Sequence, residues 1–135
     1  QAAESTHTFA EFVLASGWQP PQLDAKALVQ THCHQHAVLG FDADRTLMAK
    51  AGIAADIPDS GCCGLAGNFG FERGHYEVSQ QVGERVLLPT VRDAAPDTAV
   101  VADGFSCRTQ IAQGTERRAL HLAELLAGGL TVRGR

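Results

Sequence analysis

The sequence predicts an α/β domain: an open, mostly parallel sheet of about four strands with helices on both faces and cysteine loops at the strand carboxyl edge. Short apolar runs bounded by Pro, Gly or Asp alternate with segments of helical spacing, a pattern typical of βαβ units. The 135 residues suffice to bury a core without disulfides, and 44% hydrophobic with 19% charged residues is a globular composition. With no internal repeat or linker, we expect residues 1–135 to form a single domain.

The first half of the chain predicts two helices and two strands. Apolar residues recur at helical spacing over 6–16, which favours a helix. An apolar run over 27–31 predicts a strand that leads directly into His32-Cys33-His34-Gln35-His36. A second helix is expected over 42–51 with Asp42 as its N-cap, followed by a strand over 53–57 and a glycine-rich loop.

The longest helix is expected over residues 72–92. Val78, Val82 and Val86 recur every four residues and predict one buried stripe. Pro89 has no N–H to donate to the carbonyl four residues earlier, so we expect a kink or a helix end there.

The last third predicts one clear strand and two helices. The strand covers 98–102, between Pro96-Asp97 and Asp103-Gly104. A short helix is expected over 108–113, and a final helix presents leucines on one face before it ends at Gly128-Gly129.

Composition limits the possible partners and the setting of the chain. The formal net charge is −4 without a run of Lys or Arg, which argues against nucleic acid or an anionic membrane as the main partner. No apolar stretch approaches membrane-spanning length and no signal peptide is evident at Gln1. Because the chain does not begin with methionine, we expect an excised piece of a longer protein.

All four cysteines follow predicted strands: Cys33, Cys62, Cys63 and Cys107. The carboxyl ends of parallel strands meet at one edge of a sheet, where ligands usually bind. Four cysteines are too few for a disulfide-built fold of this length, and a bridge between neighbouring Cys62 and Cys63 would be strained. We therefore expect the thiols to form one site in a reducing compartment.

Thiolates in this arrangement favour zinc or an iron–sulfur cluster. Zinc would take four ligands, such as three thiolates and the imidazole of His34, whereas a cluster would take mainly thiolates with backbone N–H groups near the sulfurs. Gly61, Gly64 and Gly67 would allow that close approach. Two alternatives remain open: buried cysteines without a ligand, and a metal-free thiol-redox site at Cys62 and Cys63.

Three segments carry a resemblance to a known family. They are His32-Cys33-His34-Gln35, the segment Asp59-Ser60-Gly61-Cys62-Cys63-Gly64-Leu65-Ala66-Gly67-Asn68-Phe69-Gly70-Phe71-Glu72, and Gly104-Phe105-Ser106-Cys107-Arg108-Thr109-Gln110-Ile111. They resemble the cysteine-rich CCG domain of heterodisulfide reductase and of the iron–sulfur subunits of glycolate oxidase and anaerobic glycerol-3-phosphate dehydrogenase. The likeness is strongest to the C-terminal domain of large FAD-linked oxidases with 4Fe–4S centres.

The resemblance implies an electron-transfer domain of an FAD-linked enzyme that oxidises a 2-hydroxy acid such as lactate, glycolate or 2-hydroxyglutarate. It assigns Cys33, Cys62, Cys63 and Cys107 as ligands of a 4Fe–4S cluster or zinc. The implied partners are the FAD-binding and ferredoxin-like parts of the parent protein and an acceptor such as quinone. The implied location is cytoplasmic, with peripheral association at the inner membrane through the parent complex.

The sequence departs from the family motif at one position. The motif ends in Cys-x-x-Cys, and here Cys107 is followed three residues later by Gln110. One thiol is missing, which leaves the choice between cluster and zinc open. The alternative function is a structural or docking module, non-catalytic by itself, with zinc or no metal bound.

Overall fold

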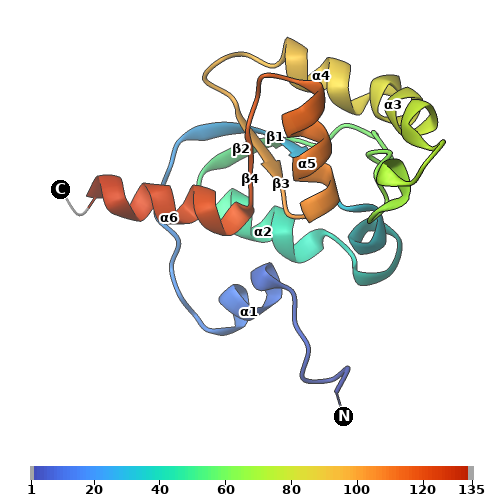
Figure 1. Cartoon of the computed structure of the whole chain (residues 1–135). Coiled ribbons are helices and arrows are strands. Elements are labelled where there is room, and N and C mark those ends of the chain that lie inside the picture. The colour runs from blue at the N-terminus through green and yellow to red at the C-terminus, as the bar shows by residue number, and fades with distance from the viewer. Residues whose placement is uncertain (1, 134–135) are drawn as a thin grey trace.

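The computed structural model describes residues 2–133 and contains a four-stranded, all-parallel sheet (Figure 1). The strands are β1 (Ala25–Gln30), β2 (Ile53–Asp56), β3 (Ala99–Ala102) and β4 (Ala119–Leu120), in the order β2-β1-β3-β4. This arrangement confirms the predicted open α/β fold. The two-residue β4 is too short for a periodic pattern to predict its position.

Helices cover both faces of the sheet, as predicted. The helices α1 (Phe9–Ala15), α2 (Asp42–Lys50) and α6 (Leu122–Arg133) supply one core, which includes Leu47, Met48 and Leu126. The second core lies against α4 (Leu87–Asp93) and α5 (Phe105–Gly114), while α3 (Tyr76–Arg85) packs beside α4. Cys63 and Cys107 are members of that second core.

The strand β1 lies between β2 and β3, so the chain adds strands first on one side of β1 and then on the other. The backbone of β1 pairs with β2 on one side, through Ala25 and Ile53, and with β3 on the other, through Ala27 and Ala99. The segments that leave β1 and β3 therefore diverge to opposite sides of the sheet, and the crevice between them is where ligands bind in open parallel sheets. Cys33 follows β1 and Cys107 follows β3.

The predicted helix over 72–92 is divided in two. The break falls at Val86 (φ −143°, ψ −51°), between α3 and α4, and confirms the interruption expected from Pro89. The predicted valine stripe is wrong: Val78 is exposed, and α3 buries Ser79 and Gly83. Small residues face inward here because the cysteine loop packs directly against the helix.

Other boundaries also differ from prediction. The helix α2 begins at Asp42 with Phe41 as its cap, one residue from expectation. The last helix, α6, continues through Gly128 to Arg133 rather than ending at the glycines. The segment 33–39, which follows β1, is helical and includes a π-helix at Gln35–Leu39, a rare form found often at functional sites.

Candidate thiol site

The three cysteine-bearing segments leave the same edge of the sheet. Cys33 lies in the helical turn after β1, and Cys62 and Cys63 lie in the loop after β2. Cys107 lies in the first turn of α5, after β3. All four thiols are free and interact with one another in two pairs.

The outer pair consists of Cys33 and Cys62. Cys33 is exposed and Cys62 half-buried, and their thiols share a hydrogen bond. Both line an open hollow of about 390 Å³ together with His36 and Arg45. Burial raises the pKa of Cys62, and the nearby thiols of Cys63 and Cys33 raise it further.

The inner pair consists of Cys63 and Cys107, which are 4% and 2% exposed. The S–H of Cys107 donates a hydrogen bond to the sulfur of Cys63, which also accepts from the backbone N–H groups of Leu65 and Ala66. These donors lower the pKa of Cys63, while donation to Cys63, together with burial, raises that of Cys107. Cys63 is therefore the thiol of this pair that loses its proton more readily.

The glycine loop brings backbone N–H groups toward the thiols. The Gly64 N–H donates to Cys62 Sγ at 3.3 Å. Gly64 has φ +96°, and a Cβ there would lie 2.2 Å from the Ser79 carbonyl oxygen, so no other residue fits. The Gly67 N–H, expected near sulfur, instead donates to Ser106 Oγ at 3.1 Å; the Gly61 carbonyl accepts from Gln30 Nε2 at 3.0 Å.

The histidines that follow β1 divide between two surfaces. His34 lines a separate depression of about 250 Å³ with His32 and His121, whereas His36 lines the hollow that contains Cys33 and Cys62. The helical turn at 33–34 separates His34 from His36, which an extended segment would have placed on one side. His36 therefore shares the thiols' surface, a placement that sequence reasoning missed.

Buried amides hold the cysteine loop, and sequence reasoning missed their role. Gln30 and Gln110 are both buried, and each donates a hydrogen bond to a backbone carbonyl of the loop. A glutamine directly after the apolar run 27–29 was the available signal for Gln30. At position 110, where the motif predicts a fifth thiol, the amide of Gln110 donates to Cys63 O at 2.9 Å and Ser79 O at 3.2 Å.

The donor set fits a thiolate-bound metal centre, since four thiols lie at one edge and N–H groups reach the sulfurs of Cys62 and Cys63. Within residues 2–133, however, no three His, Cys, Asp or Glu side chains form a ready-made metal group. Ligation would require the inner and outer pairs to draw together.

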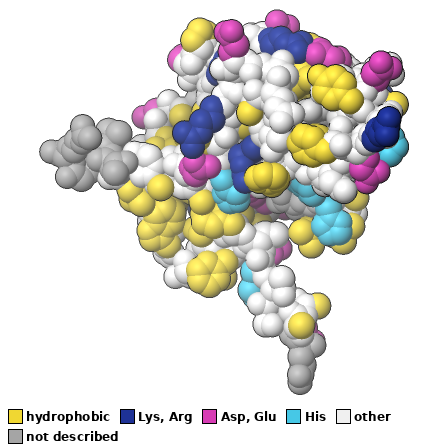
Figure 2. Space-filling model, viewed as in Figure 1, with side chains coloured by type: hydrophobic (Ala, Val, Ile, Leu, Met, Phe, Trp, Pro, Cys, Tyr) yellow, Lys and Arg dark blue, Asp and Glu magenta, His cyan; other side chains and the backbone are white. Residues whose placement is uncertain are grey.

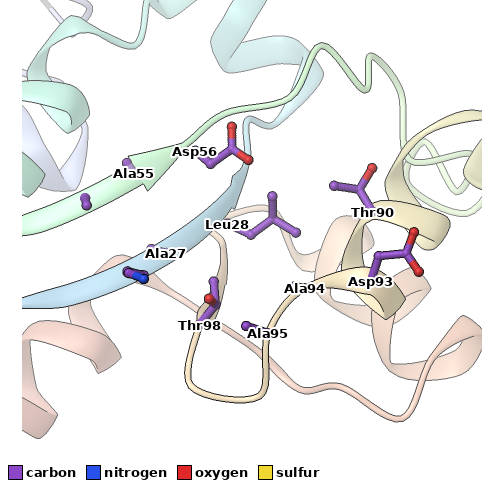
Figure 3. Close-up of a pocket in the computed structure, with 11 residues that line it drawn as sticks. Ala27, Leu28, Ala55, Asp56, Thr90, Asp93, Ala94, Ala95 and Thr98 are labelled. Carbon is purple, nitrogen blue, oxygen red and sulfur yellow. The ribbon is translucent and has the colours of Figure 1, made fainter.

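A hollow of about 550 Å³ lies away from this chemistry. It is formed by β1, β2 and the end of α4, and its lining includes Leu28, Asp56 and Thr90 but no thiol or imidazole (Figure 3). We assign it no part in the thiol site.

Fold and site together define a class: an open parallel α/β domain whose strand-end loops present four free thiols. Two curated proteins are similar in sequence to this chain. The chain is 32% identical over 110 residues to one subunit of the anaerobic glycerol-3-phosphate dehydrogenase of Escherichia coli, covering 80% of this chain and 27% of that protein. It is 31% identical over 111 residues to D-2-hydroxyglutarate dehydrogenase of Pseudomonas putida, covering 80% of this chain and 11% of that protein.

The chain thus spans about a quarter or less of the length of these curated relatives. No family model matches the sequence, and no solved structure matches it. The similarities associate the chain with oxidoreductases. Across the described residues, no helix is long and apolar enough to cross a membrane.

Proposed function

We propose that the chain is a CCG-type cysteine-rich domain that holds a metal centre in an FAD-linked oxidoreductase. The observation that supports the proposal is that Cys33, the pair Cys62 and Cys63, and Cys107 follow three parallel strands far apart in sequence, and that their thiols interact. Similarity to parts of two dehydrogenases supports a redox setting.

Cys33, Cys62, Cys63 and Cys107 would hold the metal, a 4Fe–4S cluster or zinc. A bound cluster would supply one-electron transfer, whereas zinc would be structural. The N–H of Gly64 already donates to sulfur, and Gly61 and Gly67 would shape the loop around the centre. Because zinc takes four ligands, the imidazole of His34 would enter a zinc site only in place of one thiolate, after a rearrangement of the turn that carries it.

The partners of the domain follow from the same proposal. Flavin chemistry on a 2-hydroxy acid would occur in an FAD-binding part of the parent protein, and electrons would leave through a ferredoxin-like part to an acceptor such as quinone. Residues 1–135 would be the C-terminal domain of that parent, cytoplasmic and peripheral to the inner membrane. Exposed Phe71, Tyr76 and Phe105, with the hydrophobic side chains over α3 and α5 in Figure 2, suit contact with such a partner.

Anaerobic reconstitution of the purified chain with iron and sulfide tests the proposal. We expect broad visible absorption with iron and acid-labile sulfide bound in equal amounts, and loss of both in Cys63→Ser. A chain that stays colourless and metal-free after exposure to iron, sulfide and zinc would contradict the metal proposal. Oxidation of a 2-hydroxy acid by the chain alone would contradict the assignment of that chemistry to a separate flavin part.

A second candidate is a structural or docking module with zinc or no metal. One observation favours it: Gln110 stands where the motif has its last cysteine. One zinc per chain, with no iron retained after anaerobic reconstitution, would support this candidate over the cluster.

A further inference from the structure

The vicinal cysteines are held from both ends by buried amides. Gln30, the last residue of β1, donates from Nε2 to the Gly61 carbonyl at 3.0 Å, immediately before Cys62. Gln110, on α5, donates from Nε2 to the carbonyl of Cys63 at 2.9 Å. The two amides therefore fix the peptide groups on either side of the dipeptide.

Each glutamine is itself fixed by further hydrogen bonds. The Ser60 hydroxyl donates to Gln30 Oε1, and Gln30 Nε2 also donates to the Thr31 carbonyl at 3.2 Å. The amide nitrogen of Gln110 also donates to Ser79 O at 3.2 Å. Buried amides with this many partners have little freedom to reorient.

The space around the second amide is also closed. A Cβ on Gly64 or on Gly83 would lie 3.0 Å from Gln110 Nε2. Ser79 and Gln110 are 1% and 0% exposed. The loop backbone, α3 and α5 thus meet at this side chain without room for a larger neighbour.

We propose that Gln30 and Gln110 are positioning residues that clamp the Cys62–Cys63 dipeptide and direct its two thiols to different partners. Cys62 turns outward to Cys33, and Cys63 turns inward to Cys107. The clamp concerns the site of the proposed function, but it acts on the metal-free chain and can be tested without any bound metal.

Residue-resolved alkylation of the reduced, metal-free protein tests the clamp. Methionine matches glutamine in shape but cannot donate, so we compare Gln30→Met and Gln110→Met with Gln113→Met, a control on the exposed side of α5. Tandem mass spectrometry gives the iodoacetamide reaction rate of each cysteine at several urea concentrations below unfolding.

The clamp predicts a crossover between the two variants. Gln110→Met should raise the alkylation rate of Cys63 roughly tenfold, and Gln30→Met should raise that of Cys62 roughly threefold. Each substitution should have little effect on the alkylation rate of the neighbouring thiol. The smaller effect is expected because Cys62 is already half-buried rather than buried. The acceleration should depend weakly on urea, as for local opening, and Gln113→Met should match the wild type.

Two results would overturn the clamp. One is equal acceleration of Cys62 and Cys63 in both variants with the steep urea dependence of global unfolding, which would reduce the glutamines to a general structural role. The other is rates unchanged within about twofold. If Gln110→Met does not fold, exchange of the wild-type Gln110 side-chain amide protons decides: slow exchange supports the clamp, and exchange as fast as at Gln113 contradicts it.

Discussion

The two thiol pairs occupy one edge of the sheet in very different surroundings. Cys63 and Cys107 are part of a hydrophobic core shared by β1, β3, α4 and α5, whereas Cys33 and Cys62 line an open hollow. Changes at the inner pair should therefore alter the stability of the fold, whereas the outer pair is accessible to ions and molecules from solvent. A metal held by both pairs would link the core to the surface.

The anchors of the two pairs differ as well. Near the inner pair, the neutral amide of Gln110 donates hydrogen bonds to the backbone carbonyls of Cys63 and Ser79. The π-helix that follows Cys33 is held by Gln35 Nε2, which donates to Asp44 Oδ2 at 2.7 Å in the interior. We call the contact of Gln35 with Asp44 the outer anchor and the contacts of Gln110 the inner anchor. The outer anchor thus contains a titratable group, the carboxyl of Asp44, and the inner anchor contains none.

The largest effect on the free energy of unfolding is expected from adding one methyl group at Gly64, directly after Cys63. Gly64→Ala would force a Cβ to 2.2 Å from the Ser79 carbonyl oxygen at φ +96°, so it should lower the free energy of unfolding by about 4 kcal/mol or prevent folding. Gly67→Ala is the matched control, because Gly67 has φ +73° with nothing within 4 Å, and should cost about 1 kcal/mol. Urea unfolding measures both, and equal costs would contradict the tight packing assigned to the inner side.

The next effect is a pH dependence confined to the outer anchor. Burial, with a smaller contribution from Asp103, raises the pKa of Asp44 from 3.8 to about 6. Between these values the folded chain binds a proton that the unfolded chain has released. The contribution of Asp44 to stability is therefore fully present below about pH 3.8 and is lost as the pH rises toward 6, by up to about 3 kcal/mol.

Asp44→Asn should remove this fall. Thermal unfolding between pH 4 and 6.5 compares the variant with wild type and with Asp42→Asn, an exposed control on the same helix. Parallel curves for wild type and Asp44→Asn would show that this carboxyl does not titrate in that window.

A smaller difference is expected between the cysteines themselves. Cys107→Ala removes a fully packed sulfur and the donor to Cys63, and should cost about 1–2 kcal/mol of unfolding free energy. Cys33→Ala alters an exposed side chain and should change stability by less than about 0.5 kcal/mol. Equal costs in urea unfolding would remove the distinction between an inner and an outer pair.

Sequence patterns predicted the architecture because the alternation of strand and helix requires little tertiary information. The same patterns gave wrong predictions where tertiary packing determines which residues are buried and which way the chain turns. The valines of α3 have helical spacing, but the helix buries Ser79 and Gly83 because the backbone of the cysteine loop needs the room. The helical turn after β1, which separates His34 from His36, follows from contacts such as Gln35 to Asp44, which no local pattern reveals.

Prediction of the candidate site was limited in the same way. The strand-end positions of the cysteines follow from the order of elements along the chain. Their division into pairs does not, because it depends on which way each thiol of the Cys62–Cys63 dipeptide turns. That choice is linked to Gln30 and Gln110, 31 and 47 residues away in sequence from their loop acceptors.

The central claim is that all four thiols belong to one metal site, and Co²⁺ titration of the four single Cys→Ser variants tests it most directly. Thiolate-to-cobalt charge-transfer absorption reports binding under anaerobic conditions. We predict that each of Cys33→Ser, Cys62→Ser, Cys63→Ser and Cys107→Ser weakens Co²⁺ affinity at least roughly tenfold. Wild-type affinity, within about twofold, in either outer-pair variant would contradict a single four-thiol site and restrict metal chemistry to the buried pair.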